Sequence, residues 1–302
     1  MFDKILGNDK NKKILENAIK TNKISHSYIF SGIDGIGKKM IAQQFAKSIL
    51  CLENSKPCNK CKSCIEIETN NNPDYFLIEP DNGKIKIEQI REMQKKVAEK
   101  PIISNKKVYI INDADTMTTE AQNCLLKTLE EPPEYIIIML IASNENNLLS
   151  TIKSRCTRLY FEQLSNEEIK TYIVNNYPED EINEDILEIY QGSIGKVVKL
   201  RDKKELYEKV EKIIHNLERK SLIEILQMSE EIYSSKEEIY SILDYINILL
   251  LKKSKENTRY VKTIQIVEET KKRLKVNSNY DMCIDNMLFN LWEEINEKNN
   301  RS

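Results

Sequence analysis

The residues best suited to chemistry in this sequence form a glycine-rich loop near the N-terminus. Residues 32–38 read G-I-D-G-I-G-K and match the G-x-x-x-x-G-K pattern of a phosphate-binding loop. In such a loop the glycines, here Gly32, Gly35 and Gly37, let backbone N–H groups converge on phosphate oxygens. Lys38 would then reach the terminal phosphates. The spacing therefore predicts a nucleotide site at a turn between a strand and a helix.

The groups that hydrolysis needs are missing from this predicted site. The next position should carry a Ser or Thr hydroxyl that binds Mg²⁺, but the sequence has Lys39, whose ammonium repels a cation. Farther along, Asp113 stands where a metal-organising Asp belongs, and Ala114 replaces the Glu that would polarise a water molecule. Asp115 is one residue too far along to take over this role. We expect neither ATP hydrolysis nor bound Mg²⁺; binding of ATP or ADP without hydrolysis stays open.

Four cysteines within a short segment form a second chemical cluster. They are Cys51, Cys58, Cys61 and Cys64. Zinc prefers four soft ligands at tetrahedral corners, and the absence of a nearby His or carboxylate ligand favours a structural ion over a catalytic one. A thiol–disulfide switch is the alternative, although such motifs usually carry two cysteines. The other cysteines are expected to pack as small hydrophobic side chains: Cys124, Cys156 and Cys283.

Composition excludes several classes of function. The 302 residues include 46 Lys+Arg and 48 Asp+Glu, and a net charge of −2 does not suit a chain that wraps nucleic acid by bulk charge. The N-terminus is charged where a signal peptide needs an apolar core. The longest apolar run, residues 135–142, is far shorter than the ~18 residues of a membrane helix. We therefore expect a soluble, cytoplasmic protein without membrane contact.

The elements that must position these residues follow an α/β pattern in the first half of the chain. The apolar runs at 108–111 and 135–142 are typical of strands buried on both faces of a parallel sheet. Thr119 with Gln122, and Ser165 with Glu168, fit capping boxes at the starts of two helices. The order of the elements predicts a parallel sheet with helices on both faces. Further strand patterns lie at 27–30 and 74–78, and helical patterns at 10–20, 39–50 and 87–99.

The final third of the chain differs in character. The last Gly of the sequence is Gly195 and the last Pro is Pro178, so the final third contains neither of the residues that usually mark turns. We expect an all-helical bundle there. The predicted domains are therefore residues 1–161 with the cysteine insert at 51–64, a small helical segment at 162–205, and the bundle at 206–302.

Taken together, these motifs resemble the AAA+ clamp-loader subunits of bacterial DNA polymerase III. Beside the loop and the cysteine cluster, the resemblance rests on four segments: S-H-S-Y-I-F-S-G (25–32), V-Y-I-I-N-D-A-D (108–115), L-L-K-T-L-E-E-P-P (125–133) and T-I-K-S-R-C (151–156). It is dense from about residue 2 to about 160 and nearly absent in the helical tail. It implies an AAA+ P-loop domain, a helical lid at 162–205 and a collar at 206–302 that joins subunits.

Two kinds of subunit in this family carry the zinc cluster, the ATPase subunits (gamma/tau) and the delta-prime subunits. The resemblance favours the second kind, because Lys39, Ala114 and Gly195 stand where the ATPase subunits have a Thr or Ser, an acidic residue and a nucleotide-sensing Arg. It then implies a part of the polymerase holoenzyme without ATPase or polymerase activity of its own. Its partners would be the gamma/tau and delta subunits and, through the complex, the sliding clamp and primer-template DNA.

The resemblance assigns a role to Arg155 in S-R-C. In the family this Arg projects into the ATP site of the neighbouring subunit, where a guanidinium stabilises charge on the γ-phosphoryl oxygens. Within T-I-K-S-R-C we favour this role for Arg155; an ordinary surface salt bridge is the alternative, and Arg158 is the nearest competitor for the role. Two other functions stay open: an ATP-hydrolysing subunit with unusual metal ligation, and an AAA+ adaptor outside replication.

Overall fold

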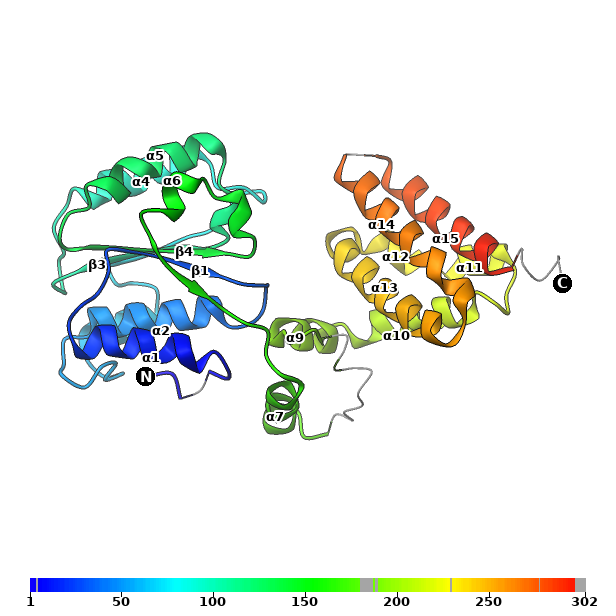
Figure 1. Cartoon of the computed structure of the whole chain (residues 1–302), viewed down its shortest axis with the longest axis horizontal. Helices are drawn as coiled ribbons and strands as arrows, with labels where there is room; N and C mark the ends of the chain where they lie inside the picture. The colour runs from blue at the N-terminus through cyan, green and yellow to red at the C-terminus, as the bar shows by residue number, and fades with distance from the viewer. Residues whose placement is uncertain (4, 180–186, 188–189, 229, 277, 297–302) are drawn as a thin grey trace. The chain divides into compact units, whose positions relative to one another are not determined.

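The computed structural model describes the chain except residues 4, 180–186, 188–189, 229, 277 and 297–302 (Figure 1). The chain divides into two compact units. The first comprises Met1–Asn183 and Tyr190–Lys196, and the second comprises Glu184–Ile189 and Val197–Ser302. Each unit has a hydrophobic core of its own.

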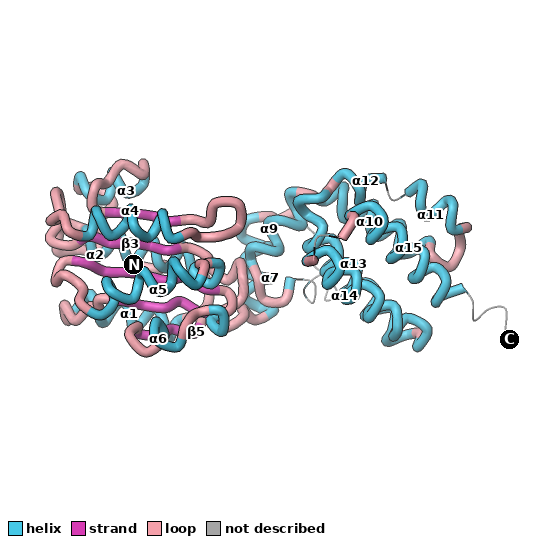
Figure 2. Tube along the Cα trace, turned by 90° about the horizontal axis from the view of Figure 1, so that it is seen from above, coloured by secondary structure: helices cyan, strands magenta, loops and turns pink. Residues whose placement is uncertain are grey.

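A parallel sheet forms the centre of the first unit. Its strands, in chain order, are β1 (Ser27–Ser31), β2 (Tyr75–Ile78), β3 (Lys107–Ile111), β4 (Ile136–Ala142) and β5 (Thr157–Tyr160). Across the sheet the order is β2-β3-β4-β1-β5, and every neighbouring pair is parallel. Figure 2 shows the strands in magenta, side by side. Strand β4 lies in the middle with all its residues buried, which is why its sequence is a continuous apolar run. The predicted parallel sheet is confirmed.

Helices cover both faces of this sheet (Figure 1). Along β4, Met139 packs into one core and its neighbours Ile138 and Leu140 pack into the other, because successive side chains of a strand point to opposite faces. The helices on the Met139 face are α1 (Asp9–Lys20) and α2 (Lys38–Leu50). Those on the opposite face are α4 (Ile87–Val97), α5 (Thr119–Glu130) and α6 (Ser150–Lys153).

The two capping boxes had different outcomes. Helix α7 (Asn166–Asn176) has the predicted one, because Ser165 and Glu168 exchange side-chain and backbone hydrogen bonds. The box of Thr119 with Gln122 was wrong by one residue, since Thr118 is the N-cap of α5 and its hydroxyl accepts the N–H of Ala121. Gln122 is instead buried. Its side-chain amide donates to the carbonyl of Asn147 and accepts the N–H of Leu149, so it holds the segment after β4 in place.

Strand β5 was not predicted. It is an edge strand with only Leu159 buried, so its sequence has no continuous apolar run. The remaining helices of the first unit are α3 (Lys62–Glu68), which follows the cysteine loop, and the first turn of α9 (Ile194–Asp202).

All regular elements among the described residues of the second unit are helices, as the lack of Gly and Pro in this part of the sequence predicts. Its core is lined by aliphatic side chains of several helices, with the buried ring of Tyr260 among them. No described helix of the chain is long and apolar enough to cross a membrane. After α9 the helices are α10 (Lys204–Asn216), α11 (Leu222–Met228), α12 (Glu230–Ser234), α13 (Ile239–Glu256), α14 (Val261–Lys275) and α15 (Tyr280–Asn296).

Candidate functional site

The glycine-rich loop joins the end of β1 to the start of α2, as its motif requires. Gly35 and Gly37 have φ angles of 76° and 93°, in the left-handed region that residues with a Cβ rarely adopt. Gly37 is the N-cap residue of α2, so the loop leads directly into the positive end of a helix dipole. The chain therefore has the backbone shape of a phosphate-binding loop.

Lys38, the lysine of this loop, is turned inward. Its side chain is buried, and its ammonium donates to the carbonyl oxygens of Gly32 and, at 2.7 Å, of Ile33. It also lies 3.7 Å from a carboxylate oxygen of Asp34. Burial lowers the pKa of the Lys38 ammonium, and the nearby carboxylates oppose that shift. The contacts that a phosphate would offer Lys38 are here supplied by the loop itself.

The segment at the start of α9 sits on top of the loop. The Ser193 hydroxyl donates to the carbonyl of Asp34 at 2.8 Å, and the Gly195 N–H donates to the carbonyl of Gly35 at 2.9 Å. A Cβ atom on Gly195 would lie only 2.7 Å from the Cα of Gly35. This close approach requires a glycine at position 195, where the family resemblance implies an Arg in an ATPase subunit.

Lys39, at the position of the Mg²⁺-binding hydroxyl, points toward a carboxylate. Its ammonium donates to Oε1 of Glu79 at 2.6 Å, and Glu79 directly follows β2. Ala114 is fully buried, in the single 3₁₀ turn η1 (Ala114–Thr116) that follows β3. A cation bound beside Lys38 would therefore meet an ammonium and a methyl group where it needs oxygen ligands.

Asp113 and Asp115 have different surroundings. Burial, followed by repulsion from Asp34 and Asp115, raises the pKa of Asp113. The carboxylate of Asp115 accepts the N–H groups of Ser143 at 3.2 Å and Asn144 at 3.1 Å, so it fastens the segment after β4. It is not free to replace the missing Glu. These partners follow β4 whereas Asp115 follows β3, so the pairing has no signal in the sequence around Asp115.

The four predicted zinc ligands come together at the end of α2. One ligand atom from each of Cys51, Cys58, Cys61 and Cys64 lies within 4.8 Å of the others. The N–H of Cys58 points to the sulfur of Cys51 at 3.4 Å, and the N–H of Cys61 to that of Cys58 at 3.3 Å. Backbone hydrogen bonds, first that of Lys60, lower the pKa of Cys58 to about 6. The donor set fits a tetrahedral zinc ion, and these cysteines could hold a structural one.

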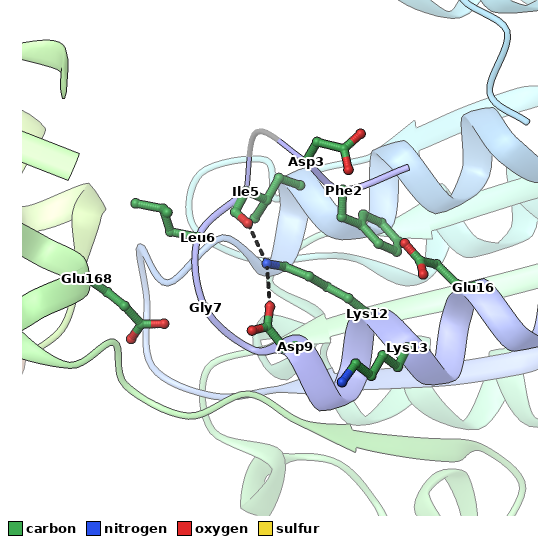
Figure 3. Close-up of a pocket in the computed structure, with 10 residues that line it drawn as sticks. All are labelled: Phe2, Asp3, Ile5, Leu6, Gly7, Asp9, Lys12, Lys13, Glu16 and Glu168. Carbon is green, nitrogen blue, oxygen red and sulfur yellow. Dashed lines mark hydrogen bonds and ion pairs between the residues drawn. The ribbon is translucent and has the colours of Figure 1, made fainter. Parts of the chain in front are cut away.

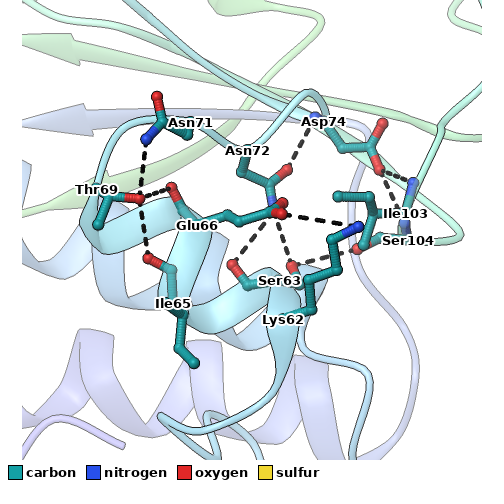
Figure 4. A network of polar contacts seen from close by, with 10 residues as sticks. All are labelled: Lys62, Ser63, Ile65, Glu66, Thr69, Asn71, Asn72, Asp74, Ile103 and Ser104. Atoms are coloured by element: carbon teal, nitrogen blue, oxygen red, sulfur yellow. Dashed lines mark hydrogen bonds and ion pairs between the residues drawn. The ribbon is translucent and has the colours of Figure 1, made fainter.

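A polar network supports the helix that carries Cys64 (Figure 4). Asn72 donates to the carbonyl of Ser63 at 3.2 Å and to its hydroxyl at 3.0 Å. The buried carboxylate of Asp74 accepts the N–H groups of Ile102, Ile103 and Ser104 at 2.7–2.8 Å. This network connects α3 to the start of β2 and to the loop before β3. The helix that follows the cysteine loop is thereby anchored to the sheet.

Arg155 lies between α6 and β5, near the N-terminal end of β1, whereas the glycine-rich loop follows the C-terminal end of this strand. Its carbonyl accepts the hydroxyl of Ser27, the first residue of β1, whereas the loop follows Ser31, the last residue of β1. Four residue steps along a strand span ~13 Å. Arg158, the competitor, lies on β5 with its guanidinium 5.9 Å from the ring centre of Tyr160. The structure therefore does not bring Arg155 to the glycine-rich loop of its own chain.

A pocket of about 450 Å³ opens beside the N-terminal segment (Figure 3). Lys12 crosses its floor and donates to the carbonyl of Ile5 and, at 3.0 Å, to Asp9. Residues 32–39 do not line it. Its walls also carry acidic and basic side chains without a common sign, so it gives no reason to assign a ligand. The lining residues are Phe2, Asp3, Ile5, Leu6, Gly7, Asp9, Lys12, Lys13, Glu16 and Glu168.

The parallel sheet, the phosphate-loop backbone and the helices that follow define an AAA+ domain of the P-loop class joined to a helical region. Comparison with known sequences narrows this class. The family described as "DNA polymerase III, delta subunit" matches residues 7–165, slightly more than half of the chain. The chain belongs to this family.

Individual relatives point the same way. The delta' subunit of DNA polymerase III from Bacillus subtilis is 42% identical over 163 residues, which are 54% of this chain and 50% of that protein. The tau/gamma subunit from Haemophilus influenzae is 35% identical over 209 residues, 67% of this chain and 30% of that protein. The chain spans about half, or less, of the length of the curated relatives it matches.

Among solved structures, a DNA polymerase III gamma subunit-related protein from Thermotoga maritima has the same fold. It is 20% identical, with a TM-score of 0.58, and the match covers 93% of this chain and 99% of that one. The predicted fold class, an AAA+ α/β domain followed by an all-helical region, is thereby confirmed.

Proposed function

We propose that this chain is a delta-prime subunit of the DNA polymerase III clamp loader. It does not hydrolyse ATP; it supplies Arg155 to the ATP site of a neighbouring gamma/tau-type subunit. Its other partners are the delta subunit and, through the assembled complex, the sliding clamp and primer-template DNA. Residues 206–302 act as the collar that joins it to these partners.

The environment of Lys39 carries the first half of this proposal. Lys39 replaces the metal-binding hydroxyl and is neutralised by Glu79 at 2.6 Å, while Lys38 is already bonded to carbonyls of its own loop. Phosphoryl transfer depends on a metal ion that bridges the β- and γ-phosphates. A domain with an ammonium at the metal position can fold and assemble with other subunits. It does not support metal-dependent phosphoryl transfer.

The position of Arg155 supports the second half. Arg155 and the glycine-rich loop lie at opposite ends of β1, so this arginine does not reach a nucleotide bound to its own loop. Any phosphate that it meets therefore belongs to another chain. Its side chain is 34% exposed, which leaves it accessible to a neighbouring molecule. A guanidinium delivered in trans stabilises charge on the transferred phosphoryl group.

The test separates the two halves. The purified chain should show no ATP turnover above background, and its complex with gamma/tau-type and delta subunits should hydrolyse ATP in response to clamp and DNA. Arg155→Ala should lower that stimulated rate and leave assembly intact, as measured by size-exclusion chromatography. Turnover by the chain alone would refute the non-hydrolysing role, and an unchanged rate with Arg155→Ala would refute the trans role.

A gamma/tau-type role is the second candidate, because tau/gamma subunits are among the relatives. It requires that ATP binds and turns over despite Lys39. Turnover by the isolated chain, without the substitution Lys39→Thr, would support it. Recovery of gamma/tau and delta subunits with the tagged chain would distinguish both clamp-loader roles from an adaptor outside replication.

A further inference from the structure

Arg155 does not project freely from the surface. Its Nη2 donates to Oε1 of Glu130 at 2.7 Å, and its Nη1 donates to the carbonyl of Thr151 at 2.8 Å. Its main-chain carbonyl is fixed to Ser27, and its N–H donates to the carbonyl of Ile152. The guanidinium is therefore held on two sides, by the last residue of α5 and by the first turn of α6.

These contacts leave donors available. A guanidinium has five N–H groups in a planar fork. One N–H of Nη2 meets Glu130, and Nη1 serves Thr151 and, at 3.4 Å, the Ser154 hydroxyl. Within the part of the chain that the structure describes, Nε of Arg155 has no partner. Nε–H and the second N–H of Nη2 can therefore meet phosphate oxygens while the Glu130 contact persists.

The pair matters more for orientation than for stability. Glu130 is 49% exposed, and an exposed ion pair contributes little to the free energy of folding. An arginine side chain, in contrast, has many rotamers, and one that is already ordered loses less conformational freedom when it engages a phosphate. Removing the Glu130 carboxylate should therefore leave the fold intact and weaken the action of Arg155.

We propose that Glu130 is a positioning residue: by its ion pair it holds the Arg155 guanidinium in the orientation in which it meets the neighbouring subunit's triphosphate. This inference rests on the proposed trans role of Arg155. It adds Glu130, the last residue of α5, to that site, and gives this one residue a part in the neighbour's hydrolysis.

A double-mutant cycle in the reconstituted complex tests the inference. Glu130→Gln, Arg155→Ala and the double variant are compared by single-turnover ATP hydrolysis at the neighbouring subunit's site. Glu130→Gln should lower the rate constant by about threefold or more, with the KM for ATP unchanged, because the order of the side chain is lost and the finger acts in the transition state. In the Arg155→Ala background the same substitution should have no further effect.

Glu131→Gln is the matched control. It removes the same charge from the next residue, which is exposed and, in the part of the chain that the structure describes, forms no hydrogen bond or ion pair with Arg155. This substitution should leave the rate unchanged. Three results would overturn the positioning role alone. The rate constant could fall equally for Glu130→Gln with and without Arg155, or it could fall equally for Glu131→Gln. It could also stay unchanged for Glu130→Gln although Arg155→Ala lowers it. No loss from Arg155→Ala would overturn the proposed function itself.

Discussion

Replacing Gly195 by Ala should loosen the contact between the start of α9 and the glycine-rich loop. The added Cβ would lie 2.7 Å from the Cα of Gly35 and 3.7 Å from its N and C atoms. These are backbone atoms, so the contact cannot be relieved by a rotamer change. Gly195 is not among the residues with positive φ, so Ala is acceptable to its own backbone and the steric contact is the source of the cost.

Two estimates of the cost agree. If the segment stays in place, overpacking of this kind costs about 1–3 kcal/mol. If it moves away, it loses the hydrogen bonds of Ser193 to Asp34 and of Gly195 to Gly35, each of which contributes about 0.5–1.5 kcal/mol. Either route predicts a loss of about 1–3 kcal/mol, which for a unit of this size corresponds to a fall in Tm of about 2–12 °C.

Scanning calorimetry measures that fall, and hydrogen exchange of the amide at position 195 reports where it originates. Ser193→Ala is the companion variant: without adding an atom, it removes the hydrogen bond that the hydroxyl donates to the carbonyl of Asp34 and the one that it accepts from the N–H of Lys196. Its loss should therefore also be about 1–3 kcal/mol, with no steric contribution. If Gly195→Ala left both the Tm and the protection of this amide unchanged, the close contact described here would be refuted.

Three further predictions concern the zinc ligands, the network beneath them and the loop. Metal analysis should find about one zinc ion per chain; a chelator or Cys64→Ser should lower the Tm of the first unit, and substoichiometric zinc with reactive thiols would favour a redox switch. Asp74→Ala should cost at least about 3 kcal/mol in urea denaturation, because three backbone N–H groups lose a charged acceptor; a loss below about 1 kcal/mol would contradict this. The raised pKa of Asp113 means that the folded state binds its proton more tightly, so ionised Asp113 destabilises the fold above its native pKa. Asp113→Asn should therefore stabilise the chain at neutral pH, and this gain should vanish as the pH falls below 3.8; the opposite sign at neutral pH would show that attraction to Lys38 outweighs burial.

Features encoded in neighbouring residues could be predicted from the sequence. The glycine-rich loop, the cysteine cluster and the apolar run of β4 each depend on short spacing, and each lies where its pattern requires. The capping box of α7 was found for the same reason. The shift of the α5 cap from Thr119 to Thr118 shows the limit, since adjacent threonines offer equivalent hydroxyls and the sequence alone does not choose between them.

What the sequence by itself determined is the chemical inventory: a phosphate-loop backbone, a lysine at the metal position, four clustered thiols and one arginine in an S-R-C motif. Only the tertiary structure decided the partners of these groups, because each partner lies on a segment remote in sequence. In the folded chain Lys39 pairs with the carboxylate of Glu79, Gly195 packs against the backbone of Gly35, and Glu130 forms an ion pair with Arg155. A hydrogen bond or ion pair depends on distances of about 3 Å, and these distances are set by the packing of helices on the sheet.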